Sequence, residues 1–358
     1  MKLGLGLYRN MLKKDYYKFA RQCGCTHIVV HLVDYFNSEV GVLPTTDKKG
    51  NWGHAVANDP IWEYENLLNL KKEIEANGLK ISAIENFSPG DWYDVLLDGP
   101  KKHEQIEKIK TLIKTVGKVG IPVIGYNFSI AGVYAHIRTT AARGGAETVI
   151  FDGENSACKE PIPKGEVWNM VYDETDYKEF VETVSQDQLW ERYEWFLREV
   201  IPVAEKAGVK LALHPDDPPV PVLRGAARLV YQPKIYQKVI DTYNSPSNSL
   251  EFCMGSIQEM SEGCIYDAIE KYASQERIAY VHFRNVKGKV PNYQEVFVDE
   301  GDIDMIKALE LYKKHNFQGV LIPDHTPEMT APGAWHAGMA YALGYMKALM
   351  KVIDKEVK

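Results

Sequence analysis

The chain has 358 residues, of which 45% are hydrophobic and 25% charged, and this ordinary composition indicates a folded globular protein. Its formal net charge of −7 argues against nucleic acid as a partner, because phosphate binding needs lysines and arginines clustered on a basic face. No apolar run is long enough for a membrane span or a secretory signal, so we expect no membrane association and a cytoplasmic location.

Short β-type segments alternate with longer helical patterns from one end of the chain to the other. We expect eight strands, at residues 3–8, 27–32, 80–86, 123–128, 210–215, 249–254, 278–285 and 319–324. Helical patterns lie between most of them, at residues 60–77, 103–119, 185–208, 234–243, 265–274 and 303–316. Right-handed crossovers make such strands parallel, so the sequence predicts an α/β fold: one (β/α)₈ TIM barrel domain over residues 1–358.

Two of these helices carry clear start and stop signals. Asp59 precedes a first-turn proline, and Asn77-Gly78 ends the same pattern. Ser185 and Gln188 fit a capping box before the helix that Gly208 ends, directly ahead of the fifth strand.

A long inserted loop, at about residues 130–185, follows the fourth strand and shows no sustained periodicity. Loops of this length are unusual unless they cover or build a site, and this one leaves the end of the barrel where active sites lie. We therefore expect it on the active face, with a disordered surface insertion as the alternative. Its Arg138 is a candidate for placing positive charge near an acidic ligand.

The fifth to eighth strands each end in a side chain that binds metals: His214, Cys253, His282 and Asp324. Taken singly each is weak, but the carboxyl ends of parallel barrel strands meet in space, and together they predict one divalent-metal site. Imidazole and thiolate suit Zn²⁺ or Fe²⁺, and carboxylate widens the choice to Mn²⁺. Four protein ligands would saturate tetrahedral zinc, so catalysis favours Mn²⁺ or Fe²⁺. Five cysteines without a CxxC pair favour reduced thiols.

Polar residues surround these candidate ligands. Asp216 and Asp217 follow His214 and would bind a hydroxyl or, alternatively, only shape a turn. Arg284 lies two residues after a ligand, placed to pair with a carboxylate or to form a surface salt bridge. His325 is a candidate acid or base, or a support for its neighbour Asp324.

These motifs resemble the mannonate dehydratases, metal-dependent barrel enzymes of hexuronate catabolism. The matching segments occur in family order: Ile84-Glu85, Gly125-Tyr-Asn-Phe128, Arg138-Thr139, His214-Pro-Asp-Asp-Pro-Pro219, Cys253-Met-Gly-Ser256, His282-Phe-Arg284, Gly301-Asp-Ile-Asp-Met305 and Pro323-Asp-His325. The resemblance implies Mn²⁺ or Fe²⁺ held by the four strand-end residues, catalysis by His325, and conversion of D-mannonate to 2-keto-3-deoxy-D-gluconate. The candidates for contact with the sugar acid are Glu85, Asn127, Arg138, Asp216, Asp217, Ser256 and Arg284.

The chain departs from the family pattern near its C-terminus. Family members tend to carry a tyrosine soon after a Pro-Gly pair, whereas here Pro332-Gly333 is followed by Ala334, Trp335 and His336. Tyr341, further on, is then the candidate for the second proton-transfer residue.

Two alternatives stay open: a xylose-isomerase-like sugar isomerase or epimerase that uses a divalent metal, and a barrel that binds a sugar acid without turnover. The tryptophan- and tyrosine-rich helices would suit a homo-oligomer interface or the barrel's own outer packing equally.

Overall fold

Eight parallel strands close into a barrel in the computed structural model, which describes residues 1–35, 51–175 and 177–355. The strands, in chain order, are β1 (Lys2–Leu7), β2 (His27–His31), β3 (Lys80–Glu85), β4 (Val123–Tyr126), β9 (Lys210–Leu213), β12 (Asn248–Cys253), β13 (Ile278–His282) and β16 (Val320–Ile322). Their order around the barrel follows the chain, with β1 pairing with both β2 and β16. The (β/α)₈ barrel predicted from the sequence is confirmed.

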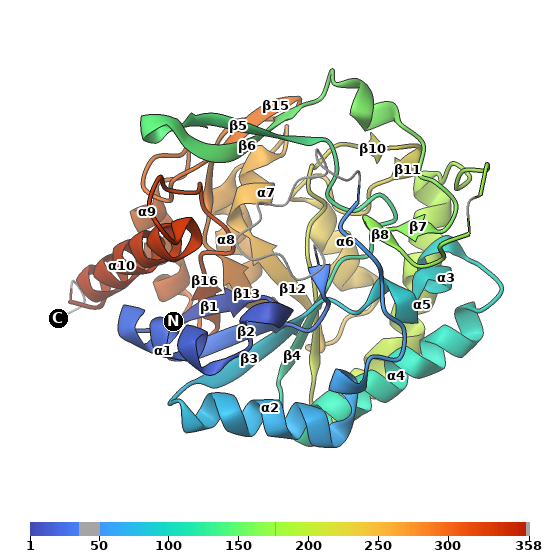
Figure 1. Ribbon diagram of the computed structural model, residues 1–358, viewed down its shortest axis with the longest axis horizontal. Helices are drawn as coiled ribbons and strands as arrows, with labels where there is room; N and C mark the ends of the chain where they lie inside the picture. Colours follow the sequence, from blue (N-terminus) through green and yellow to red (C-terminus); the bar gives the residue numbers. More distant parts are fainter. Residues whose placement is uncertain (36–50, 176, 356–358) are drawn as a thin grey trace.

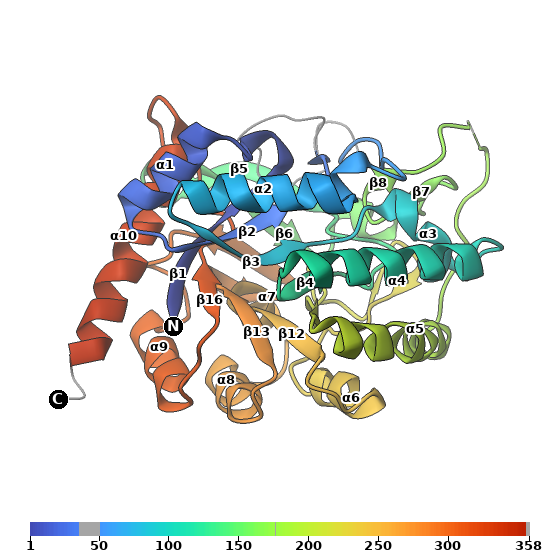
Figure 2. The same cartoon turned by 90° about the horizontal axis from the view of Figure 1, so that it is seen from below.

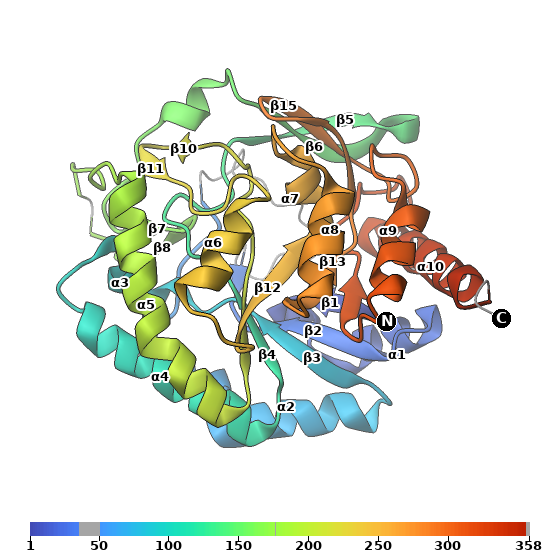
Figure 3. The same cartoon turned by 180° about the vertical axis from the view of Figure 1, so that it is seen from behind.

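Helices surround the strands (Figure 1 and, from behind, Figure 3). The longer ones are α1 (Lys14–Cys23), α2 (Tyr64–Ala76), α4 (Lys102–Val119), α5 (Gln186–Ala207), α6 (Ile235–Thr242), α8 (Ile265–Ser274), α9 (Met305–Lys314) and α10 (Ala334–Lys355). In Figure 2, α9, α8 and α6 lie in turn outside β16, β13 and β12. Apolar side chains fill the space between strands and helices, and a second apolar layer lies inside the barrel. No helix among the described residues is both long and apolar enough to cross a membrane.

The helix signals read from the sequence are largely confirmed. Ser185 and Gln188 form the expected capping box, and Gly208 ends α5 in the left-handed conformation. The helix expected from residue 60 is divided in two. Asp59 caps a short 3₁₀ turn, η3 (Pro60–Trp62), and Glu63 is then extended, so that α2 begins only at Tyr64.

The insertion after β4 contains strands that its composition did not indicate. β5 (His136–Ala142) and β6 (Ala146–Asp152) form a hairpin, and β6 pairs with β15 (Asn292–Val296), which pairs in turn with β14 (Asn285–Lys289). This four-stranded antiparallel sheet lies along one edge of the barrel (Figure 1). Two shorter strands, β7 (Glu166–Val167) and β8 (Met170–Val171), form a second hairpin. The alternative of a disordered insertion does not hold for the described part of this segment.

The remaining elements are short. They are the helices η1 (Arg9–Met11), η4 (Pro89–Asp91), α3 (Tyr93–Leu97), η5 (Arg143–Gly145), η6 (Ser156–Lys159) and α7 (Met254–Glu259), and the hairpin of β10 (Val222–Leu223) with β11 (Ala226–Ala227). Helix α7 begins directly after β12, so the backbone turns sharply at Cys253.

Candidate active site

A cavity opens at the carboxyl ends of the barrel strands. Most of its lining comes from strand ends, and the rest comes from the insertion, the segment after β2 and the hairpin after β13. The lining residues are Tyr8, His31, Tyr35, Trp52, Glu85, Asn86, Asn127, Val133, His136, Val149, Trp168, His214, Asp217, His282, Arg284, Glu295, Asp324 and His325. The insertion therefore builds part of the cavity wall.

Three of the four metal-ligand candidates come together at one end of this cavity. Donor atoms of His214, Cys253 and His282 all lie within 4.8 Å of one another. The parallel register places Cys253 beside His282 on neighbouring strands. Asp324 lies next to this group, with Oδ2 3.3 Å from Nδ1 of His282. Its backbone has a φ of 60°, a conformation uncommon for residues other than glycine, which turns the chain sharply as it leaves β16.

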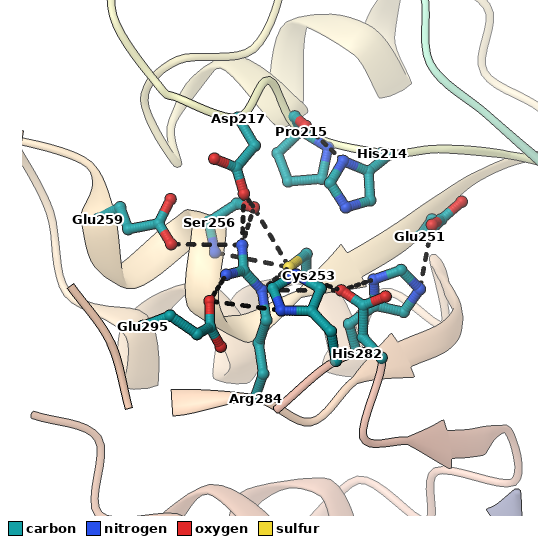
Figure 4. Close-up of polar contacts among 12 residues, drawn as sticks. His214, Pro215, Asp217, Glu251, Cys253, Ser256, Glu259, His282, Arg284 and Glu295 are labelled. Carbon is teal, nitrogen blue, oxygen red and sulfur yellow. Dashed lines mark hydrogen bonds and ion pairs between the residues drawn. The ribbon is translucent and has the colours of Figure 1, made fainter. Parts of the chain in front are cut away.

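The sulfur of Cys253 lies in a setting that favours the thiolate. Nε of Arg284 and the hydroxyl of Ser256 each donate to Sγ at 3.2 Å, and the backbone N–H of Ser256 donates at 3.5 Å (Figure 4). Burial acts to raise the pKa of the thiol, but the charge of Arg284 and hydrogen bonds from the two histidines outweigh it and hold the pKa well below its usual range. A buried thiolate is a strong ligand for a transition metal.

The other three candidates share this electrostatic setting. Burial acts to lower the pKa of His214, yet its hydrogen bond with Cys253 raises the pKa to about 9. Burial acts to raise the pKa of Asp324, but the charges of His282 and His325 hold it well below its usual range. The thiolate and the carboxylate thus attract positive charge to this end of the cavity. Two imidazoles, a thiolate and a nearby carboxylate are a donor set that fits a divalent transition metal, which would replace the protons on the imidazoles.

Arg284 is the hub of a buried ionic network beside the metal-ligand group. Its guanidinium pairs with Asp217 and Glu295 and lies 3.3 Å from Glu259 (Figure 4). The side chain is 4% exposed, so the alternative of a surface salt bridge is wrong. Ser256 belongs to the same network, because its hydroxyl oxygen also lies 2.9 Å from Oδ2 of Asp217.

The two adjacent aspartates have different surroundings. Asp217 lines the cavity and also accepts a hydrogen bond of 2.9 Å from Tyr293. Asp216 is not among the described residues that line the cavity. It pairs with Arg228 at 3.0 Å and accepts from the backbone of Val230 at 2.7 Å, so it holds the loop after β9 in place.

His325 lies in the cavity, with Nε2 3.4 Å from Oδ2 of Asp324 and Nδ1 3.7 Å from Oε2 of Glu295. Glu85 and Asn127, two of the candidates for contact with the sugar acid, also line the cavity. Nδ2 of Asn127 donates to Asn86 at 2.9 Å. The cavity lining thus combines an ionisable ring with amide groups that suit the hydroxyls of a sugar.

Tyr341 and Arg138, like Asp216, are predicted site residues that do not line the cavity. Tyr341, on α10, is 37% exposed and accepts a hydrogen bond of 3.4 Å from Arg143. The start of α10 is held against α1 by ring contacts of Trp335 and His336 with Tyr16, and Tyr341 packs against Phe297 outside the cavity lining. Arg138, on β5, pairs with Glu147 at 2.8 Å.

Several cavity residues were missed in the reading of the sequence. Tyr8 and His31 follow or end predicted strands, so the rule that located the metal ligands applies to them as well. His136, Trp168 and Glu295 lie in the insertion and in the hairpin after β13. No periodic pattern marks these three, because their positions depend on strand pairing between distant segments. Glu251, two residues before Cys253, was also missed.

Comparison with known proteins gives a consistent picture. The family model for D-mannonate dehydratase matches residues 20–358. A mannonate dehydratase of Streptococcus equi subsp. zooepidemicus is 33% identical over 286 residues, covering 76% of this chain and 77% of that protein. One from Streptococcus uberis is 30% identical, covering 83% and 89%.

Solved structures agree in fold. The crystal structure of mannonate dehydratase from Streptococcus suis serotype 2 superposes with a TM-score of 0.77 at 27% identity, covering all of this chain and 96% of that one. A xylose isomerase domain protein from Planctomyces limnophilus superposes with a TM-score of 0.59 at 13% identity, covering 99% and 98%. The second likeness concerns the fold alone.

Proposed function

Because the chain belongs to the D-mannonate dehydratase family, we propose that its cavity removes water from D-mannonate to give 2-keto-3-deoxy-D-gluconate. The protein is a hydro-lyase of sugar acids. One observation supports placing this function in the cavity: His214, Cys253 and His282 cluster at the carboxyl ends of neighbouring strands, with Asp324 beside them.

These four residues would hold the metal, as the chemistry of the donor set supports. We propose Mn²⁺ or Fe²⁺, because both accept more than four ligands and leave positions for oxygens of the sugar acid. When bound, the cation stabilises the negative charge that develops as the proton on C2, beside the carboxylate, is lost.

Dehydration also needs two proton transfers at the substrate. The proton on C2 must leave, and the hydroxyl on C3 departs far better as water than as hydroxide. We assign the first transfer to His325, whose imidazole lies in the cavity within 3.4 Å of Asp324. The C3–O bond then breaks, the oxygen leaves as water with a proton from the protein, and the resulting enol becomes the 2-keto acid.

We assign the second transfer to Tyr8 in place of Tyr341. Among the described residues, Tyr8 and Tyr35 are the tyrosines that line the cavity. The hydroxyl of Tyr35 accepts a hydrogen bond of 3.1 Å from Asn86, whereas Tyr8 directly follows β1, the strand that pairs with β16 and so lies next to Asp324. Burial raises the pKa of Tyr8 above its usual value, so the phenol is protonated and has a proton to give to the leaving hydroxyl.

The remaining polar lining would orient the sugar acid. Asn127, Asp217 and Glu85 present groups that suit hydroxyls, and Arg284 keeps the charge of Asp217 and the thiolate balanced. Asp216, Arg138 and Ser256 are better explained as supports of the loop, the sheet and the network around Cys253.

A sugar isomerase or epimerase shares the fold but is not favoured, because the family match extends over residues 20–358. A barrel that only binds a sugar acid is disfavoured by two ionisable groups, Tyr8 and His325, in one cavity.

The test is to incubate the metal-loaded protein with a panel of aldonates and ketose–aldose pairs and to measure 2-keto-3-deoxy acid. We expect product from D-mannonate. Formation of no keto-deoxy acid from any aldonate would overturn the proposed dehydration.

Three broader expectations accompany this function as proposals. We propose that residues 1–358 form one domain, since the strands of the barrel run from Lys2 to Ile322. A cytoplasmic location is supported by the metabolic role of the family and by five free cysteines. A homo-oligomeric state is proposed from the aromatic helices, and light scattering of the purified protein tests it.

A further inference from the structure

A pair of buried carboxylates lies beneath the metal-ligand group, inside the barrel. Glu251 precedes Cys253 by two residues on β12, so both side chains are on the same face of that strand. Glu85 ends β3. Glu251 is fully buried and, unlike Glu85, is not among the described residues that line the cavity.

Both carboxylates meet the same nitrogen of His282. Nε2 lies 3.2 Å from Oε2 of Glu85, in hydrogen-bonding geometry, and 3.2 Å from Oε1 of Glu251 (Figure 4 shows the contact with Glu251). The other ring nitrogen, Nδ1, lies 3.3 Å from Oδ2 of Asp324, and the ring is also hydrogen-bonded to Cys253. Nε2 of the imidazole thus faces the buried carboxylate pair, and Nδ1 faces Asp324 in the ligand group.

The barrel interior is built to accommodate Glu251. Elsewhere inside the barrel this layer is filled by apolar side chains such as Val29, Ala83 and Ala212. A methyl group at Gly125 would collide with the carboxylate of Glu251 and the hydroxyl of Tyr280, so the absence of a side chain there makes room for this polar pair. Glu251 hydrogen-bonds with Tyr280 and lies 3.2 Å from His282. Burying a carboxylate inside the barrel is still costly to the fold, which indicates a role beyond packing.

From this geometry we infer that Glu251, together with Glu85, is a positioning residue for the metal ligand His282. The two carboxylates hold the proton on Nε2, which fixes the tautomer and turns Nδ1 towards Cys253 and Asp324. Histidine ligands commonly donate their second N–H to a carboxylate, and such partners strengthen metal binding. The inference rests on the proposed metal site, but it does not depend on which sugar acid is dehydrated.

A second cation between Glu85, Glu251 and His282 is the competing explanation, because their ligand atoms also lie within 4.8 Å of one another. It is disfavoured because the same imidazole would have to bind two cations and give up both of its protons.

Metal affinity tests the inference, measured by competition between a chelator and Mn²⁺ without substrate. Glu251→Leu removes the acceptor and should weaken Mn²⁺ binding by about 10–100-fold, whereas Glu251→Gln keeps an acceptor oxygen and should stay close to the wild type. The control is Glu166→Leu, which removes a buried carboxylate that pairs with Arg224 and should leave Mn²⁺ affinity unchanged. Equal affinities in Glu251→Leu and the wild type, or two Mn²⁺ ions bound per chain, overturn the inference.

A second measurement needs no variant and so does not depend on how Glu251→Leu folds. In zinc-loaded protein labelled with ¹⁵N-histidine, long-range ¹H–¹⁵N correlations identify which nitrogen of His282 carries the proton. We expect the proton on Nε2, and a proton on Nδ1 refutes the positioning role. Both measurements are made without D-mannonate, so a failed dehydration assay and a failed positioning role are distinguishable.

Discussion

The cavity has two halves of different character. The charged half, made by His214, His282, Arg284 and Asp324 with Cys253 beneath them, comes from β9, β12, β13 and β16 or the residues that follow them. The aromatic half is made by Tyr8, Tyr35, Trp52 and Trp168, whose rings contact one another at centroid distances of 5.4 to 6.1 Å.

The difference separates two tasks. Thiolate, carboxylate and imidazole groups attract a cation, and the charges that they carry must be balanced by buried partners such as Arg284. Aromatic rings attract no such cation, but they exclude water and give the space a fixed shape, which strengthens the electrostatic interactions opposite them. We expect metal binding to depend on the charged half, and proton transfer to the substrate to depend on both halves.

The largest effect is expected in the charged half. Cys253→Ala removes the thiolate at the centre of the ligand group, and we expect loss of both bound metal and dehydration, measured by elemental analysis and by the keto-deoxy acid assay. Cys264→Ala, which alters an exposed cysteine, is the matched control and should keep both. Full metal content in the Cys253 variant would refute the proposed coordination.

His325 lies in the cavity beside Asp324, and its removal should separate proton transfer from metal binding. His325→Gln is expected to lower kcat by about 10²–10⁴-fold, with bound metal retained, because the residue is adjacent to a ligand but is not one of the four. Loss of metal along with activity would instead assign His325 to the support of Asp324.

A smaller loss is expected in the aromatic half. Tyr8→Phe removes only the hydroxyl, and we expect kcat to fall by about 10²-fold with little change in metal content. Tyr341→Phe, on the exposed face of α10, should keep the wild-type rate. The opposite result, a lowered kcat in Tyr341→Phe and an unchanged kcat in Tyr8→Phe, would assign the second proton transfer to Tyr341.

The smallest effect concerns stability at acid pH. Burial lowers the pKa of His136 from its ordinary 6.5 to about 4. As the pH falls below about 6.5, the unfolded chain therefore binds a proton on the His136 ring. The folded chain binds that proton only near pH 4. Stability from this group is present above pH 6.5 and is lost as the pH falls towards 4, by at most about 3 kcal/mol. Urea unfolding at pH 7 and pH 5 should show a smaller decrease in His136→Gln than in the wild type, and equal decreases would contradict the assignment.

The sequence predicted the charged half much better than the aromatic half. Cys253 and His282 end strands that their own apolar patterns reveal, and parallel strands bring such ends together. Trp168 and His136 lie in the insertion, where β6 pairs with β15 across about 140 positions, and no local pattern encodes that pairing. The sequence also could not distinguish the roles of the adjacent residues Asp216 and Asp217. Of the two, only Asp217 lines the cavity.

Tyr341 shows a different limit. Its distance from Pro332-Gly333 made it the nearest substitute for a family tyrosine, but the start of α10 is fixed by ring contacts with α1. The direction of that helix depends on packing between the two ends of the chain.

The sheet of β5, β6, β15 and β14 has a practical consequence for engineering. Its strands come from two places in the chain, the insertion and the hairpin after His282, and they share one set of backbone hydrogen bonds. A graft that exchanged residues 136–152 alone would put at risk the pairing of β15 with β6 and leave β14 as its one secure neighbour in this sheet. Anyone who wishes to change the substrate range of this barrel should therefore transplant residues 136–152 and 285–296 as one cassette.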